Sequence, residues 1–520
     1  MKKWLIRVFL ILLFAVGIGS GYVFTKMRDR HPGYKVDLSV QDTPEGALQV
    51  GFAKQSITPE VPDRWTDAND NAQYDAGEGD TFTDGNNNGH FDPVWIAGFQ
   101  NRRPANGVHD TLWARAMVID DGTTRLALVV LDAIGYGADD IIAVRKLIPD
   151  ETAVDYTIVS STHSHEAPDL LGLWGESEFK SGLDPDYRKF VQEQAAEAVK
   201  SAVAQLRPAK LRFAEDLSGA QDLVTDSRKP TVLDPAIRLV QAVDIETTRT
   251  LGVLFAWSNH PETLWNKNLL LSSDFPHFLR QGIENGVHFG DSTVMQGLGG
   301  TAIFINGSIG GLMTTPPEFG IRDPFLDTTY LEPSFDKARA QGEHLALLGL
   351  KALQDTTEVV EVERSAIQLR AKTFTLPLAN PLYRAAAIMG VLDRGTSSWM
   401  KIRSEVCYWK LGPAGFLHQP GEIYPEIVMG GIEAPEGQDF SLQPIETPPL
   451  MDLMDDDIKF VIGLSNDMIG YIIPKSEWDA EPPFLYGASE SPYGEINSVG
   501  PETGPIIYRE LTEILKDLNE

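Results

Sequence analysis

Apolar runs of strand length alternate with segments of helical periodicity over residues 126–353, and this alternation constrains the fold more than any other feature. The strand-like runs lie at 126–131, 156–160, 251–257 and 302–305, and the helical segments at 139–147, 187–206, 277–284 and 334–353. Such alternation is typical of α/β proteins. Further strand candidates surround Phe374, Phe416 and Ile462, and a last helix is expected at 507–518. We expect one large mixed α/β domain over 48–520, preceded by a polar tether at 31–47.

The first 30 residues carry the pattern of an N-terminal membrane anchor. Lys2, Lys3 and Arg7 precede an uncharged run over 8–24, near the shortest length that spans a bilayer. Apolar residues continue past the small residues of 17–21, which favours an uncleaved anchor over a cleaved signal peptide or a buried core helix. We therefore expect a single-pass membrane protein whose domain lies outside the cytoplasm, in the periplasm or extracellular space. Cleavage of this segment would instead give a secreted protein.

Charge and cysteine content exclude two classes of function. The net charge of −30 argues against nucleic acid as a partner, because its phosphates would be repelled. The single cysteine, Cys407, rules out an internal disulfide and a zinc site built from several cysteines. Any metal must therefore be held by histidine, carboxylate or other oxygen ligands.

Two histidines follow the strand predicted at 156–160, in Thr162-His163-Ser164-His165. The carboxyl ends of strands are where open α/β sheets commonly place their sites, and residues two apart in extended backbone point to the same side. The alternative is a pair of surface histidines in a turn. Because the chain has only ten histidines, we favour a functional pair that faces one metal ion or one substrate.

A third histidine, His260, follows the strand predicted at 251–257. Taken alone, it fits a metal ligand or a core histidine equally well. Asp274 and His277 follow soon after; they either support the site from behind or, for Asp274, cap a helix. Three imidazoles, or two with oxygen donors, suit Zn²⁺ with an open coordination position. Zinc lowers the pKa of a bound water toward about 7.

Several motifs resemble the neutral ceramidase family over roughly residues 48–515. They are Val50-Gly51-Phe52, Ser56-Ile57-Thr58-Pro59, Gly98-Phe99, Gly107-Val108-His109-Asp110 and Leu112-Trp113-Ala114-Arg115-Ala116. The most specific is Ser161-Thr162-His163-Ser164-His165, which is similar to the family's Thr-His-Thr-His-Ser block. The resemblance implies a zinc hydrolase that cleaves the N-acyl amide of a ceramide-like lipid.

The resemblance also implies roles for individual residues. His163 and His260 are expected zinc ligands, and Glu422 and Tyr471 occupy the positions of the family's two remaining ligands. His165 is expected to line the site without being a primary ligand, and it is the candidate base for the proton of the attacking water. The residues alone would not select Glu422 or Tyr471, since a Glu after Pro-Gly is usually a turn residue and a Tyr after Gly is usually in the core.

The chain departs from the family pattern at the serine of the family's Ser-Pro motif. The family's Ser-Pro motif would fall near 306–311, where Gly311 takes the serine position and no proline follows. Ser308 lies three residues earlier and is the nearest hydroxyl in this segment. Arg228, in Asp226-Ser227-Arg228, resembles a family arginine near the substrate. We also expect this sequence to lack the family's C-terminal β-sandwich module.

An inserted segment at 62–93 is rich in Asp, Asn and Gly. Its first half has oxygen side chains at positions 1, 3, 5, 9 and 12 of an EF-hand calcium loop, and its second half at positions 1, 3, 5 and 9. The candidate calcium ligands are Asp67, Asn69, Asn71, Asp75, Glu78, Asp84, Asn86, Asn88 and Asp92. Too few residues separate the halves for the helices of an EF-hand pair. We expect a calcium-stabilised loop without helices; the alternative is a solvated acidic loop.

Three functions remain open. The first is hydrolysis of a lipid amide by metal-activated water, and the second is zinc-dependent hydrolysis of a different amide or ester. The third is a non-catalytic metal-binding protein that has kept the fold without the family serine. The position of Ser308 distinguishes the two hydrolase functions from the non-catalytic one, because a Ser308 hydroxyl at the metal would favour hydrolysis.

Overall fold

The larger of two sheets has nine strands, in the order β15-β12-β11-β9-β3-β6-β7-β8, with β19 paired to β9. The computed structural model describes residues 2–519. The pairs β7–β8 and β12–β15 are parallel and the other pairs are antiparallel. The strands are β3 (Gln49–Ser56), β6 (Trp113–Asp120), β7 (Arg125–Leu131), β8 (Tyr156–Ser161), β9 (Arg207–Asp216), β11 (Ile237–Asp244), β12 (Thr250–Trp257), β15 (Thr301–Asn306) and β19 (Val360–Val362). The four strands predicted at 126–305 are all present in this sheet.

A second sheet of five strands packs against the first. Its order is β1-β21-β22-β23-β25, and only β23 and β25 are parallel. The strands are β1 (Asp37–Val40), β21 (Gln368–Pro377), β22 (Lys401–Leu411), β23 (Ala414–His418) and β25 (Ile458–Ile462). One core cluster contains side chains of both sheets, including Phe52, Phe213 and Trp409. The stretch 31–47, expected to be a tether, includes β1, which pairs with β21.

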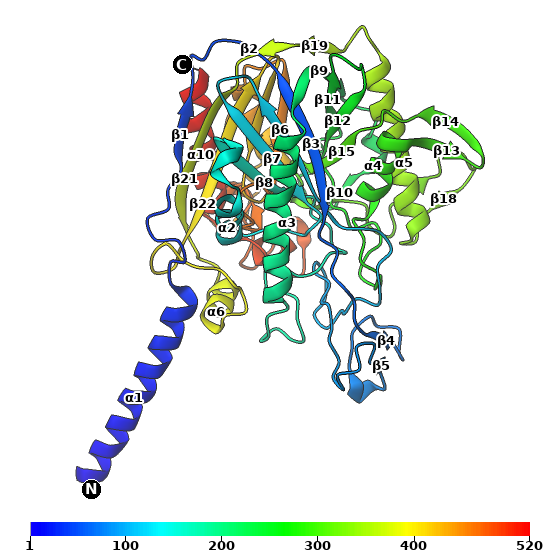
Figure 1. The fold of residues 1–520 in the computed structure, drawn as a ribbon. Coiled ribbons are helices and arrows are strands. Elements are labelled where there is room, and N and C mark those ends of the chain that lie inside the picture. Colours follow the sequence, from blue (N-terminus) through cyan, green and yellow to red (C-terminus); the bar gives the residue numbers. More distant parts are fainter. Residues whose placement is uncertain (1, 520) are drawn as a thin grey trace.

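Helices cover the outer faces of both sheets (Figure 1), so the fold has four layers. Helices α2 (Ala138–Leu147) and α3 (Pro185–Ala204) pack on one half of the large sheet, and α4 (Phe275–Asn285) and α5 (Phe335–Gln354) on the other. Helix α10 (Thr503–Asn519) covers the small sheet. Local signals begin these helices: α3 starts at Pro185, after Asp184 accepts hydrogen bonds from two amides of its first turn.

Shorter elements complete the fold. The remaining helices are α6 (Pro381–Met389), α7 (Pro425–Met429), α8 (Leu450–Leu453) and α9 (Tyr493–Ile496). The remaining strands pair as β2 (Gly46–Ala47) with β20 (Arg364–Ser365), β4 (Arg64–Thr66) with β5 (Thr81–Thr83), β10 (Thr225–Asp226) with β16 (Met313–Thr314), β13 (Gly286–Phe289) with β14 (Ser292–Gln296), β17 (Ile321–Arg322) with β18 (Thr329–Tyr330) and β24 (Glu422–Ile423) with β26 (Tyr471–Ile472). The segment around β4 and β5 protrudes from the body (Figure 1).

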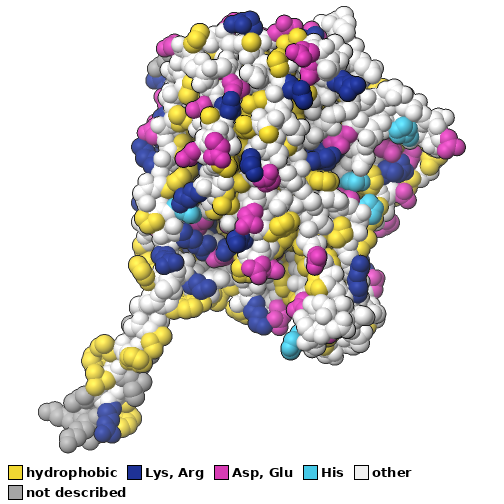
Figure 2. All heavy atoms as spheres, in the orientation of Figure 1, with side chains coloured by type: hydrophobic (Ala, Val, Ile, Leu, Met, Phe, Trp, Pro, Cys, Tyr) yellow, Lys and Arg dark blue, Asp and Glu magenta, His cyan; other side chains and the backbone are white. Residues whose placement is uncertain are grey.

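The N-terminal segment is helical, but the expected membrane anchor over 1–30 is wrong. Helix α1 spans Lys2–Met27 and projects from the body (Figures 1 and 2). No helix within residues 2–519 is both long and apolar enough to cross a membrane. The uncharged run over 8–24 is short of the roughly 20 apolar residues that a bilayer requires. Gly17, Gly19 and Gly21 interrupt it and contribute no apolar side chain.

The excess negative charge does not form a single patch on the face shown in Figure 2. Acidic side chains are interspersed there with lysine and arginine. Mixed signs of this kind limit the long-range field of the surface, although the net charge is −30.

The large sheet curls so that its two edge strands approach each other. Asn306, the last residue of β15, donates from Nδ2 to the carbonyl of Thr162, just after β8, at 3.1 Å. The amide of Ser161 donates to the carbonyl of Leu464, and the amide of Gly463 to that of Asn306, so the loop after β25 joins both edges. Strand twist accumulates across a sheet of this size and favours such curling. The ends of β8 and β12 therefore meet.

Candidate metal centre and adjoining pocket

His163 lies immediately beyond β8, and its ring is fixed by the backbone. Its amide donates to the carbonyl of Ala133, and its Nδ1 lies 2.5 Å from the carbonyl oxygen of Ile134. A carbonyl can only accept, so Nδ1 of His163 carries the proton and Nε2 holds the lone pair. The residue has φ +69°, an uncommon conformation for a residue with a side chain.

His260 is fixed in the same way at the end of β12. Its amide and its Nδ1 both lie within hydrogen-bonding distance of the carbonyl oxygen of Met313, at 3.0 and 2.8 Å. Nε2 of His260 therefore also holds a lone pair. The ring centroids of His163 and His260 are 4.8 Å apart, although the two residues follow strands from opposite parts of the sheet.

Glu422 and Tyr471 face the two histidines from a short parallel ladder. They are register partners in β24 and β26. Oε2 of Glu422 lies 3.1 Å from Nε2 of His260 and 3.5 Å from Nε2 of His163. The hydroxyl of Tyr471 lies 3.3 Å from Nε2 of His260. The four residues expected to hold zinc thus converge on one point, and each is at least 96% buried.

The donor set at this point fits a metal ion. Both Nε2 atoms and the carboxylate oxygen of Glu422 present lone pairs to one another, an arrangement that a cation between them stabilises. The ligand atoms of His163, His165 and His260 also lie within 4.8 Å of one another. Imidazole and carboxylate donors suit zinc and related ions.

His165 lines the centre beside this group. Its ring centroid is 4.9 Å from that of His163 and 5.7 Å from that of His260. Burial lowers the pKa of His165 well below its usual value, and the nearby His163 and His260 lower it further. Nδ1 of His165 lies 3.3 Å from Oε2 of Glu262. The sequence prediction missed Glu262, because a position two residues after His260 does not by itself indicate a contact with His165.

An apolar pocket leads away from the centre. Its wall includes His163, His165, Glu422 and Tyr471, and the empty space within and in front of it, open solvent included, is about 910 Å³. Most of the remaining lining is apolar, including Leu170, Leu173, Trp174, Leu378, Ile402 and Val499. A mostly apolar pocket with a few convergent polar groups is the usual form of a small-molecule site.

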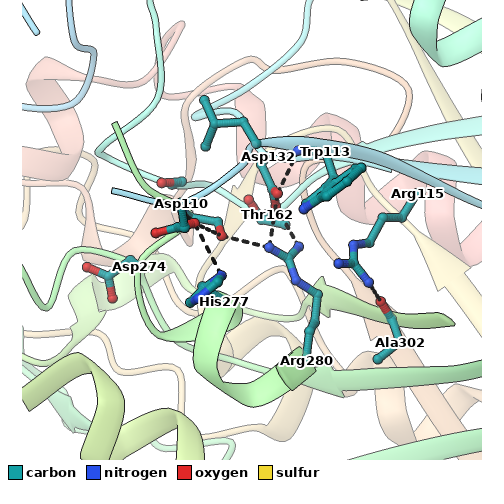
Figure 3. Close-up of polar contacts among 12 residues, drawn as sticks. Asp110, Trp113, Arg115, Asp132, Thr162, Asp274, His277, Arg280 and Ala302 are labelled. Atoms are coloured by element: carbon teal, nitrogen blue, oxygen red, sulfur yellow. Dashed lines mark hydrogen bonds and ion pairs between the residues drawn. The ribbon is translucent and has the colours of Figure 1, made fainter. Parts of the chain in front are cut away.

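A buried ion pair supports the segment that holds His163 (Figure 3). Arg280 on α4 donates to both carboxylate oxygens of Asp132, at 2.8 and 3.0 Å, and to the hydroxyl of Ser273 at 2.7 Å. Asp132 also accepts the amide hydrogen of Trp113 at 2.9 Å. Asp132 precedes the two carbonyl groups that bind His163, so this pair holds them in place.

Asp274 caps a helix, as one of its two alternatives predicted, and it also binds the backbone of the segment after His260. Its carboxylate caps α4 at the amide of Phe275 and accepts the amide of Leu264, four residues after His260, at 2.9 Å. Its backbone has φ +61° and ψ −147°, a strained conformation for a residue with a side chain. His277 lies on α4 with Nδ1 3.5 Å from Asp110 (Figure 3).

Arg228 and Ser308 lie outside the group of four converging residues. Arg228 donates to both oxygens of Glu495 at 2.7 Å and to the hydroxyl of Tyr424, two residues beyond Glu422. The hydroxyl of Ser308 is buried and lies 3.4 Å from Asp234, as a donor to its carboxylate. Gly311 has φ +67°, and a Cβ there would face Asp226 and Pro425.

In each half of the 62–93 insert, two asparagine side chains point to one carboxylate. The side-chain amides of Asn69 and Asn71 donate to Oε2 of Glu78, and those of Asn86 and Asn88 donate to Oδ2 of Asp92. Asp67 and Asp84 bind backbone amides of their own loops. Asp75 caps a short 3₁₀ turn. The calcium assignment stays a prediction.

Two packed sheets covered by helices form a fold of the neutral ceramidase type. One solved structure that shares it is neutral ceramidase from Pseudomonas aeruginosa, with a TM-score of 0.62 and 15% identity over 90% of this chain and 74% of that one. A ceramidase complexed with C2 matches with the same TM-score and identity, over 91% of this chain and 75% of that one. Identity this low shows the fold alone. No protein-family model and no curated protein matches the chain.

Proposed function

We propose that residues 48–520 form a zinc-dependent hydrolase that cleaves the N-acyl amide bond of a lipid-like substrate. The observation that carries the proposal is the convergence of two Nε2 atoms, a carboxylate oxygen and a phenol on one buried point beside an apolar pocket. The pocket suits an acyl chain, and the solved structures with this fold are described as ceramidases.

Different residues of the chain are proposed to bind the metal, accept a proton and hold the substrate. Zinc held by His163, His260, Glu422 and Tyr471 would polarise the scissile carbonyl and activate water. His165 stands beside this point and accepts the proton that the water loses. The apolar wall around Leu173 excludes bulk water and holds the acyl chain, which orients the amide toward the centre.

Ceramide itself is expected to be a poor substrate. No serine stands at the family position, and the Ser308 hydroxyl is directed to Asp234. Losing one positioned polar group typically costs about 10²–10³ in rate. We therefore expect weak ceramidase activity, with zinc-dependent hydrolysis of another amide or an ester.

A second candidate function is metal binding without turnover. This function is favoured by the lack of a serine at the centre, since neither Ser308 nor a side chain at 311 faces the histidines. In that case the protein would bind a lipid amide in the pocket and release it unchanged.

Metal analysis followed by a substrate panel separates these functions. The zinc content of the purified protein is measured first, and ceramide, other N-acyl amides and acyl esters are then assayed. We expect one zinc per chain, and hydrolysis that stops with a chelator and in His163→Ala. Brisk ceramide cleavage would show that the serine is dispensable here. No hydrolysis by fully zinc-loaded protein would favour the binding function.

A further inference from the structure

Glu262 is a buried carboxylate beside the metal centre, at a position for which the ceramidase resemblance implies no role. Its side chain is 9% exposed, and Oε2 lies 3.3 Å from Nδ1 of His165. Its other oxygen, Oε1, accepts a hydrogen bond from the hydroxyl of Thr314 in β16. One oxygen of Glu262 is therefore anchored to the fold while the other faces His165.

His165 needs an acceptor for its ring N–H. A neutral imidazole carries one N–H donor and one lone pair, and burial disfavours the charged form. Neither ring nitrogen of His165 makes a hydrogen bond of good geometry within residues 2–519. Leaving such a donor unpaired costs about 1–3 kcal/mol. At 3.3 Å, Oε2 of Glu262 lies close to Nδ1 of His165. Catalytic hydrogen bonds are often long or poorly aligned before substrate binds.

In the other two histidines, His163 and His260, Nδ1 likewise points away from the centre. Nδ1 of His163 and of His260 donates to the carbonyls of Ile134 and Met313, so each presents Nε2 to the centre. For His165, the candidate acceptor of the Nδ1–H is the Glu262 carboxylate and not a backbone carbonyl. A carboxylate also directs Nε2 to the centre, and it raises the basicity of the ring. It stabilises the imidazolium that forms when Nε2 takes a proton.

We infer that Glu262 is a positioning residue that accepts the Nδ1–H of His165 and so keeps the lone pair of His165 on Nε2. In the hydrolytic step one proton passes from water to Nε2, Nδ1 keeps its own proton, and Glu262 remains a carboxylate. The catalytic consequence rests on the proposed hydrolase function, whereas the tautomer of His165 is independent of it.

The tautomer is measured by ¹⁵N NMR of the full-length, zinc-loaded protein labelled at histidine. The signals of His165 are identified by their loss in His165→Gln. We expect Nδ1 to be protonated, with its proton in a strong hydrogen bond. In Glu262→Gln that proton signal moves upfield, because a neutral acceptor binds more weakly than a carboxylate. In Glu262→Ala the two tautomers mix. The control is Glu246→Gln, at an exposed glutamate, which leaves the signals unchanged.

Two NMR results would overturn the inference: a His165 that carries its proton on Nε2, or an Nδ1 signal that Glu262→Gln does not move. Zinc content supplies a further check. If Glu262→Gln loses zinc, Glu262 is a ligand and not a positioning residue. With a substrate in hand, Glu262→Gln should lower kcat roughly 10²- to 10⁴-fold, the range of acid–base catalysis, at unchanged KM and zinc content. If the native chain hydrolyses nothing, the proposed function fails while the NMR result still decides the role of Glu262.

Discussion

His260 and Glu422 lie 162 residues apart in the sequence, yet Nε2 of one is 3.1 Å from Oε2 of the other. Because Nδ1 of His260 donates to the carbonyl of Met313, this contact brings two lone pairs together. A cation between them turns that repulsion into two ligand bonds. The pair therefore defines where a metal is expected.

Removing either histidine should remove the metal. His163→Ala and His260→Ala each delete one of four donors, and we expect zinc content to fall from about one per chain to a small fraction of that. The measurement is elemental analysis after dialysis against a weak chelator. His288→Ala, at an exposed histidine, is the matched control and should keep its zinc. Full zinc occupancy in both site variants would reject the ligand assignment.

Gly98 should not tolerate a side chain, because the ring of His165 fills that space. A Cβ at Gly98 would lie 2.6 Å from ring atoms of His165, and the residue has φ +106°. Gly122→Ala is the control, since Gly122 has φ +87° with no described atom within 4 Å of its Cβ position. We expect Gly98→Ala to lose about 1–3 kcal/mol more unfolding free energy than Gly122→Ala, the usual cost of overpacking. Equal losses measured by urea unfolding would contradict the placement of His165.

The ion pair of Arg280 and Asp132 should show strong coupling. Arg280→Met leaves the Asp132 carboxylate buried and unpaired, which typically costs about 3–5 kcal/mol. Adding Asp132→Asn removes that charge while its side-chain oxygen can still accept the amide of Trp113, so the double variant should regain part of the loss. A double-mutant cycle by urea unfolding measures this, and simple additivity of the two changes would contradict it.

Stability should depend on pH through Asp140. Burial raises the pKa of Asp140 to about 6, above the ordinary value of 3.8. An acid whose folded-state pKa is raised contributes stability at low pH, and that stability is lost as pH rises through about 6. Asp140→Asn should therefore gain stability relative to the native chain between pH 4 and pH 8, by up to about 3 kcal/mol. Asp327→Asn, at a fully exposed aspartate, should show no such gain in the same urea titrations.

Calcium should stabilise the 62–93 insert without affecting chemistry. A ligand that binds only the folded state raises the melting temperature with its concentration. We expect added calcium to raise Tm, and the rise to shrink in Asp67→Asn and Asp84→Asn, each of which removes one carboxylate from a loop. Magnesium, which demands tighter octahedral geometry, should act less. As a control, metals are removed with a chelator, zinc is restored, and Tm is measured with and without calcium. Equal Tm values would show that the insert is a solvated acidic loop and not a calcium site.

Local pattern predicted most of the secondary structure. The strands at 126–131, 156–160, 251–257 and 302–305 and the helices between them lie close to their expected bounds, since apolar periodicity and caps act over a few residues. The histidines after two of these strands were found for the same reason. The N-terminal helix lies where the anchor was expected, but no helix within residues 2–519 is long and apolar enough to cross a membrane.

Other parts of the site carry no local signal. Glu422 and Tyr471 stand out only through resemblance to ceramidases, because a carboxylate after a turn and a tyrosine in a core look ordinary in sequence. Glu262 was missed for the same reason: nothing near it in the sequence indicates that His165 lies 3.3 Å away.

The sequence by itself determined the α/β elements, the strand ends that carry His163 and His260, and the absence of a cysteine-based metal site. Only the tertiary structure decided that these strand ends meet. The large sheet curls until β15 reaches the segment after β8, and the ladder of β24 with β26 then brings Glu422 and Tyr471 to the same point. Strand formation depends on neighbouring residues, whereas sheet closure depends on twist summed over nine strands and on packing against a second sheet. That sum cannot be read from any single segment.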